Sequence, residues 1–250
     1  MPTPGRACPA GDNPVGMPTI AVIDFETTGS SPAQGARATE IAAVLVRGGR
    51  IVDRFQSLMR SGAWVPPFIE QLTGISNAML ADAPDADAVM HEVARFTEGC
   101  PLVAHNAAFD RGFWLAEAAR AGIRPDPPPS FACTVRLSRR LYPQAPNHRL
   151  GTLAAWHGLP AAGRAHRALA DATTTAQLLL RIQHDLAAAL HRAAAGDAAH
   201  GAPGVPRDAI DRAPVIDHAL LCDLQRTPAQ QLPRWLARRA RSAAPACPMP

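Results

Sequence analysis

The hydrophobic pattern begins with strand-like segments. Thr19–Phe25 is apolar almost throughout and predicts a first strand. Two further apolar segments, Thr39–Val46 and Arg50–Leu58, flank Gly48-Gly49, and a glycine pair between apolar runs is a strong hairpin signal. The N-terminal part of the chain therefore predicts strands, two of them joined as a hairpin.

Helix-like and strand-like segments alternate further along the chain. Helical spacing of apolar residues, with Gly or Pro at the boundaries, predicts helices at Pro66–Leu72, through Val89, Val93 and Phe96, and at Asn106–Ala121, Val135–Tyr142, Leu150–His157 and from Ala168 into the 190s. Short apolar segments predict strands at Pro101–Ala104 and Ser130–Thr134. This order predicts a mixed α/β sheet with helices on its faces.

The two ends of the chain lack this periodicity. Residues 1–17 are rich in Pro and Gly and predict a disordered N-terminal segment, so the folded domain is expected over residues 18–195. Gly, Ala and Pro dominate beyond it. Residues 196–250 therefore predict an Ala/Pro/Arg-rich tail, which is either flexible or a small interaction segment.

One part of the tail has a helical pattern of its own. Leu232, Trp235 and Leu236 have i, i+3, i+4 spacing, and Pro233 suits a helix start. Five arginines without an intervening acidic residue surround them: Arg226, Arg234, Arg238, Arg239 and Arg241. A short amphipathic helix that binds a DNA polymerase, a sliding clamp or nucleic acid is one interpretation. A solvated basic tail is the alternative.

Composition narrows the class of protein. The 47% hydrophobic and 18% charged content of the 250 residues fits a globular protein, and no apolar run of about 18 residues predicts a membrane span. No basic stretch followed by an apolar one predicts a secretory signal. The five cysteines have no C-x-x-C spacing, which indicates neither a disulfide framework nor a zinc site and favours a reducing cytosol. Abundant Ala, Arg, Pro and Gly indicate a GC-rich coding bias, so a bacterial cytosol is expected. The net charge of +4 permits an anionic partner.

Two carboxylates stand at the end of the first predicted strand. Residues i and i+2 of a strand point to the same face, so Asp24 and Glu26 point together while Phe25 points into packing. Two like charges this close repel each other unless a cation neutralises them. Mg²⁺ and Mn²⁺ prefer such oxygen ligands, so the pair predicts half of a metal site.

Further acidic positions occur near predicted helix starts. Asp110 falls in the first turns of one helix, and Asp171 near the start of the long C-terminal one, where α/β sites usually form. His166 precedes Asp171 by five residues, a net rotation of about 140° on a helix of ~3.6 residues per turn. If both act in one site, His166 must lie before the helix proper, and Gly163 makes a loop there plausible.

These motifs together resemble those of a known enzyme family. Asp24-Phe25-Glu26-Thr27-Thr28-Gly29, His105-Asn106-Ala107-Ala108-Phe109-Asp110 and His166 with Asp171 are similar to the three exonuclease motifs of the DEDDh-type 3′–5′ exonucleases. This family includes the proofreading epsilon subunit of bacterial DNA polymerase III and its stand-alone homologues. The resemblance covers residues 18–185 and includes Leu72-Thr73-Gly74-Ile75 between the first two motifs.

The resemblance implies an RNase H-like fold and a set of site residues. By resemblance, Asp24, Glu26, Asp110 and Asp171 bind two divalent cations, Mg²⁺ or Mn²⁺, and His166 is the general base of a two-metal-ion hydrolysis. It also implies contacts between the terminal nucleotide and a further set of residues: Thr27 and Thr28 through their backbone, Phe68, Leu72, Thr73, Asn106 and Phe109. From its place in the sequence, His105 is interpreted as structural, and Asn106 most simply as a helix N-cap.

The resemblance implies removal of nucleoside 5′-monophosphates from single-stranded or frayed 3′ ends of DNA, in replication proofreading or repair. Two alternatives stay open at this point. One is an RNA exonuclease of the RNase T or oligoribonuclease type, because the 2′-OH pocket is not visible in a sequence. The other is an accessory subunit that docks on a polymerase.

Overall fold

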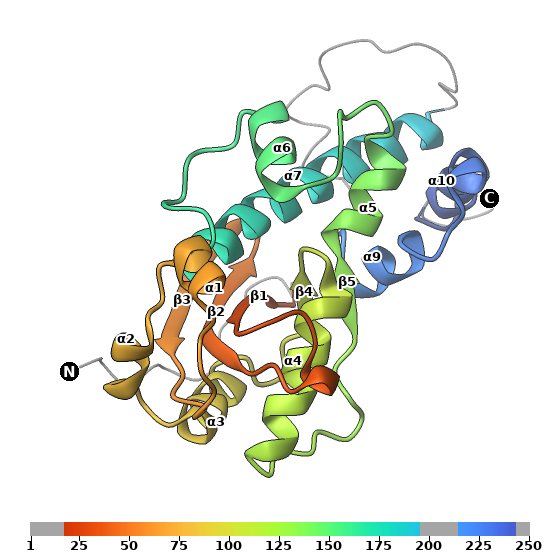
Figure 1. Cartoon of the computed structure of the whole chain (residues 1–250). Coiled ribbons are helices and arrows are strands. Elements are labelled where there is room, and N and C mark those ends of the chain that lie inside the picture. Colours follow the sequence, from red (N-terminus) through yellow and green to blue (C-terminus); the bar gives the residue numbers. More distant parts are fainter. Residues whose placement is uncertain (1–17, 196–214, 244–250) are drawn as a thin grey trace.

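A computed structural model of the chain describes residues 18–195 and 215–243 (Figure 1). The predictions for residues 1–17, 196–214 and 244–250 lie outside the described residues. A five-stranded mixed sheet carries helices on both faces, so the predicted architecture is confirmed.

The sheet is centred on the strand that carries the paired carboxylates. Strand β1 (Ile20–Thr27) pairs antiparallel with β2 (Ala38–Arg47), which continues through a hairpin into β3 (Arg50–Leu58). Gly48 and Gly49 form the turn with φ values of 58° and 75°, which glycine adopts without strain. On its other side β1 pairs in parallel with β4 (Leu102–Ala104), and β4 with β5 (Phe131–Cys133).

The two faces of the sheet have separate cores. Ala21, Ile23 and Phe25 of β1 belong to the cluster formed with α3 (Ala86–Phe96) and α4 (Ala107–Arg120). Ile20 and Val22 point the opposite way, toward the long helix α7 (Ala168–Ala194). Because both faces are covered, β1 is apolar at nearly every position until Asp24.

The remaining helices of the domain are short. They are α1 (Pro67–Thr73), α2 (Asn77–Ala81), α5 (Thr134–Leu141) and α6 (Leu150–Trp156), with a 3-10 turn at Pro32–Gln34. Their bounds agree with the predicted segments to within a residue or two, except that α2 was not predicted. It has only five residues and begins at Ser76, whose side chain accepts a hydrogen bond from the Met79 amide.

The prediction of a flexible tail is wrong for residues 215–243. They form α9 (His218–Leu224), a 3-10 turn (Ala229–Gln231) and α10 (Leu232–Ala243), beside α5 and α7 (Figure 1). The expected helical spacing around Trp235 is confirmed. Its apolar side packs on the α7 core, where Trp235 is only 3% exposed, so burial within the chain orders this segment.

Specific hydrogen bonds hold α9 on the edge of the sheet. The Gln225 side chain accepts from the Cys133 amide at 2.8 Å and donates to the Phe131 carbonyl at 3.0 Å, so it continues the pairing of β5. Arg140 of α5 donates to the Thr227 carbonyl at 2.7 Å. An edge strand that would otherwise be open is thereby covered. Within the described residues no helix is long and apolar enough to cross a membrane.

Candidate active site

The paired carboxylates lie at the carboxyl end of β1, on the face covered by α7. Asp24 is part-buried and Glu26 is 9% exposed. Phe25 between them points into the opposite core and contacts Phe113. The alternation of a strand therefore places both carboxylates on one side, as the sequence predicts.

Asp110 comes from the other face of the sheet. It sits in the first turn of α4 with 2% exposure, and its carboxylate accepts a hydrogen bond from the Phe25 amide at 3.2 Å. This bond ties the start of α4 to β1 between Asp24 and Glu26. A residue 85 positions away in sequence is thus brought to the end of the strand.

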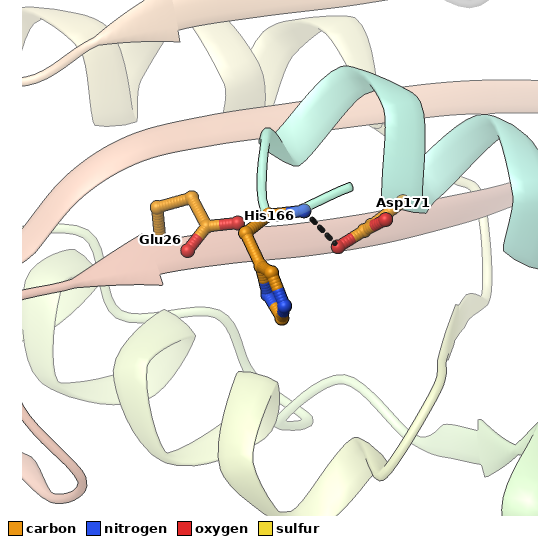
Figure 2. Close-up of side chains that lie close together, drawn as sticks. All are labelled: Glu26, His166 and Asp171. Atoms are coloured by element: carbon orange, nitrogen blue, oxygen red, sulfur yellow. Dashed lines mark hydrogen bonds between the residues drawn. The ribbon is translucent and has the colours of Figure 1, made fainter. Parts of the chain in front are cut away.

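His166 lies on a loop before α7, as the five-residue spacing predicts. The helix begins at Ala168, and His166 has a left-handed backbone with φ 59°. Such a conformation is uncommon for a residue with a side chain. The His166 amide donates to the Asp171 carboxylate at 3.1 Å, which closes the loop and leaves the imidazole exposed (Figure 2).

Glu26, His166 and Asp171 form a compact cluster of potential ligand atoms. One ligand atom from each lies within 4.8 Å of the other two, and His166 stands between the two acidic residues (Figure 2). Asp24 and Asp110 lie close enough to repel each other's charge. The predicted catalytic and metal-binding residues therefore meet at one end of the sheet.

The carboxylates of this site are destabilised as anions by burial and by one another. Burial, and then repulsion from Asp171 and Glu40, raises the pKa of Glu26 to about 8. Burial raises the pKa of Asp110 to about 7, although the Phe25 amide opposes the shift. The pKa of Asp24 is raised by burial and by its carboxylate neighbours, and that of Asp171 by burial. Carboxylates so destabilised as anions fit divalent cations, whose charge would offset both effects.

Glu40 is a site residue that the sequence analysis missed. It stands opposite Glu26 in the β1–β2 register and is fully buried. Its carboxylate accepts from the Arg167 guanidinium at 2.7 and 3.1 Å and from the Ala168 amide at 3.0 Å, so it anchors the start of α7. Burial favours a raised pKa for Glu40, but these hydrogen bonds outweigh it and lower the pKa. A charged residue within the apolar run of β2 was the available signal.

The Thr27-Thr28 turn is fixed by internal hydrogen bonds. The Thr27 hydroxyl donates to the Gly29 carbonyl at 2.7 Å, and Thr28 exchanges hydrogen bonds with the backbone of Arg37. The Thr28 amide is therefore engaged within the protein. The expected backbone contact with a nucleotide stays a prediction for the other backbone groups of the turn.

The segment around α1 presents apolar side chains to solvent. Phe68 is 67% exposed and Leu72, one turn later, 47%, so both can take the apolar contact predicted for them. Thr73 differs from the prediction. It is buried, and its hydroxyl donates to the Ile69 carbonyl and accepts from the Ile75 amide, so its side chain holds the end of α1.

The residues of the motif that precedes Asp110 differ in their surroundings. The His105 ring bonds the Thr134 hydroxyl at 2.9 Å, and burial lowers its pKa to about 4, so it is neutral and structural as predicted. Asn106 is the N-cap of α4, but with φ 64° its side chain makes no capping bond, and it is exposed. Phe109 packs against Phe113, with ring centroids 4.9 Å apart and the rings tilted by 50°.

An open cleft of about 980 Å³ adjoins the carboxylates. Asp171 of α7 and Arg139 of α5 line it, together with His166 on the loop before α7 and with Asn106 and Arg149 at the starts of α4 and α6. The cleft is therefore acidic at its catalytic end and basic along its far wall, which suits a ligand with phosphate groups.

Comparison with known proteins agrees with this geometry. An Exonuclease family model (RNase T) matches residues 21–179. The 3′-5′ exonuclease DinG of Bacillus subtilis is 39% identical over 171 residues, which cover 67% of this chain and 18% of DinG. DNA polymerase III PolC-type of the same organism is 38% identical over 170 residues, covering 68% of this chain and 12% of PolC. The chain thus spans less than a fifth of the length of these two relatives.

Solved structures show the same architecture. Exonuclease X in complex with 5′ overhanging duplex DNA is 32% identical with a TM-score of 0.53, and the match covers 66% of this chain and 91% of that one. The nuclease domain of 3′hExo, a DEDDh family member bound to rAMP, is 22% identical with a TM-score of 0.58, covering 68% and 94%. The predicted RNase H-like exonuclease fold is confirmed. Because the family model matches more than half of the chain, this protein belongs to the Exonuclease (RNase T) family.

Proposed function

We propose that this protein is a divalent-metal-dependent 3′–5′ exonuclease that releases nucleoside 5′-monophosphates from single-stranded or frayed DNA. The observation that carries the proposal is the meeting of four carboxylates with the exposed His166 at one end of β1. Family membership supports the same reaction class. A bacterial cytosolic location and a role in replication proofreading or repair are part of the proposal and are supported by the bacterial relatives.

Four carboxylates would hold the cations: Asp24, Glu26, Asp110 and Asp171. When bound, two divalent cations would supply charge neutralisation for the phosphate and a lowered pKa for the attacking water. The raised carboxylate pKa values support this assignment, since the four groups have little other cationic compensation among the described residues.

His166 would act as general base. Its imidazole is exposed toward the cleft, while its amide is bonded to Asp171, so the ring can move a proton to solvent without leaving the site. Arg167, the next residue, is held by Glu40. The backbone that carries the ring is therefore anchored at His166 and at Arg167, and Phe68 and Leu72 would contact the terminal nucleotide from α1.

DNA is preferred over RNA as substrate in this proposal. The solved relative at 32% identity is bound to duplex DNA, whereas the relative bound to rAMP is only 22% identical and bears on the fold alone. A ribonuclease is the second candidate, and the exposure of Asn106 near the cleft leaves space for a 2′-OH. Docking to a polymerase through Trp235 is less favoured, because that side chain is buried against α7.

The proposed site is tested with Asp24→Asn. Losing one cation ligand removes several kcal/mol of transition-state stabilisation, so nucleotide release should fall at least about 1,000-fold. The control is Asp53→Asn, an exposed carboxylate on β3. Both variants should keep the far-UV circular dichroism of the parent. Release by Asp24→Asn at the parent rate would overturn the assignment of the site.

One gel tests the direction of cleavage, the requirement for a divalent metal and the preference for DNA or RNA. 5′-labelled DNA and RNA 20-mers are incubated with Mg²⁺, Mn²⁺ or EDTA, and 3′-labelled copies run beside them. We expect a ladder of shortened products from 5′-labelled DNA and immediate release of a labelled mononucleotide from 3′-labelled DNA. With EDTA, neither product should form. Faster release from RNA than from DNA would replace the DNA assignment with the ribonuclease one.

A further inference from the structure

Arginines gather around a hollow that lies outside the candidate active site. The hollow, of about 460 Å³, lies between α9 and α10 and is lined by Arg226, Arg234 and Arg238, all exposed. Thr227 and Gln231 add polar groups, and Trp235 lines it as well. Three guanidinium groups therefore border one concave surface.

The carboxylate in the hollow does not cancel this charge. Asp223 lines it, but its Oδ2 is engaged by the guanidinium of Arg239 and accepts from the Trp235 indole at 2.8 Å. Arg239 is thus the ion-pair partner of Asp223, although the charge of Arg238 also lowers the pKa of that carboxyl. Within the described residues the three lining arginines make no ion pair, and Arg226 donates to the Cys222 carbonyl at 2.8 Å. Their charge is available to an anion from outside.

The hollow has a fixed geometry. Trp235 is buried on the α7 core, Gln225 is bonded to β5, and Arg140 of α5 donates to the carbonyl of Thr227. A solvated basic helix would have no such attachments. Placing three arginines on an anchored surface lowers the entropic cost of binding a multivalent anion.

The hollow and the active-site cleft lie on two sides of α5. Arg139 lines the cleft, while the adjacent Arg140 contacts Thr227, which lines the hollow. Arg136, one turn earlier, is exposed on the same helix. A helix with its side chains is about 10–12 Å across. A strand whose 3′ end lies in the cleft would therefore have to pass across the width of α5 to reach the hollow.

We infer that the arginine hollow between α9 and α10 binds the phosphate backbone of the nucleic-acid strand whose 3′ end enters the cleft. Arginine presents a planar fork that matches phosphate oxygens. The inference rests on the proposed exonuclease function and adds a contact upstream of the 3′ end of the strand. The family match ends at residue 179, so this surface lies outside the part of the chain that the family model covers.

Equilibrium binding tests the hollow without any hydrolysis. The full chain is titrated against a 5′-fluorescein-labelled DNA 20-mer in EDTA, between 50 and 200 mM NaCl. In the triple variant Arg226→Gln, Arg234→Gln, Arg238→Gln, affinity at the lowest salt should fall at least about 10-fold, and the slope of log K against log salt should become shallower by about 2. The control, Arg50→Gln, Arg54→Gln, Arg95→Gln, removes the same charge from exposed positions on β3 and α3.

The outcomes separate a specific contact from general electrostatics. Weaker binding and a shallower slope in the hollow variant, with the control at parent affinity, support the inference. Equal losses in both variants, no loss in either, or a parent protein that binds no DNA would each overturn it. If the triple variant fails to fold, the single variant Arg234→Gln should still lose affinity about threefold.

Strand length supplies a second readout. With Mg²⁺ or Mn²⁺, KM for a 20-mer should rise in the hollow variant, while KM for a dinucleotide, too short to cross α5 from the cleft to the hollow, should stay at the parent value. An equal rise for both lengths would contradict the inference. A parent protein that binds the 20-mer in EDTA but releases no nucleotide would refute the proposed function and leave the binding result standing.

Discussion

Two glutamates that face each other across β1 and β2 have opposite environments. Glu26 and Glu40 are direct partners in the register, and like charges in that position destabilise a sheet. Glu40 receives Arg167 and the start of α7, which lowers its pKa, whereas Glu26 has its pKa raised to about 8. One carboxylate is thus committed to structure, and the other is left for a cation.

This difference predicts how stability changes with pH in the metal-free protein. Glu26 titrates near 4.5 when unfolded and near 8 when folded, so the folded state binds more protons between those values. Unfolding free energy should therefore fall as pH rises, by about 1–2 kcal/mol between pH 7 and 9. The histidines with lowered pKa values act in the opposite direction, but most of their contribution is complete by pH 7, above their unfolded value of 6.5, so they offset only part of this change.

Urea unfolding in EDTA at pH 7 and pH 9 measures the effect, and Glu26→Gln should flatten it. Added Mn²⁺ should stabilise the parent more at pH 9, because protons then compete less for the ligands. A metal-free protein whose stability rises over this interval would contradict the raised pKa values.

At the scale of elements, the loop that carries His166 is held on two sides. Glu40 of β2 binds Arg167 after the histidine. Arg164 before it lies against the end of α1, so close to Gly74 that a Cβ there would approach a guanidinium nitrogen to 2.5 Å. Gly74 also has φ 74°. A side chain at this position would strain the left-handed backbone, and the flexible end of Arg164 would have to move aside.

Replacing Glu40 should separate positioning from catalysis. Glu40→Gln leaves Arg167 without its partner and weakens the anchor of α7, so kcat should fall about 10- to 100-fold, as for other residues that orient a site ligand. The control is Asp185→Asn, which removes an ion pair with Arg181 on the same helix, away from the cleft. Steady-state kinetics on a DNA 20-mer measures both. A Glu40→Gln enzyme with parent kcat would show that the loop needs no such anchor.

The sequence predicted most helices and strands well, because the spacing of apolar residues and the glycines that end an element are both patterns within a few neighbouring residues. The end of α1 at Gly74 and the two-glycine hairpin are examples. The Glu40–Arg167 pair joins positions 127 apart, and neither residue alone indicates the other. The helical period of α10 was visible as well. Its orientation was not, since that depends on the complementary surface of α7.

At the scale of the whole molecule, α9 and α10 complete the domain. The cluster on the α7 face includes Leu221, Leu224 and Trp235 together with Leu186 and Leu190 of α7. Gln225, at the end of α9, also covers β5 at the edge of the sheet. The structural unit therefore extends past residue 195, where the sequence analysis placed the end of the domain, and its arginine hollow is attached to the same core as the carboxylates.

Two tryptophans provide a matched test of this attachment. Trp235 is 3% exposed and Trp64 is 65% exposed. Trp235→Ala should lower the free energy of unfolding by about 3–5 kcal/mol, the usual cost of emptying a buried aromatic site, whereas Trp64→Ala should change it little. Urea denaturation followed by circular dichroism compares the two. Equal stabilities would mean that α10 is not packed on α7 in solution, and the arginine hollow would then lose the fixed geometry on which its binding to a strand depends.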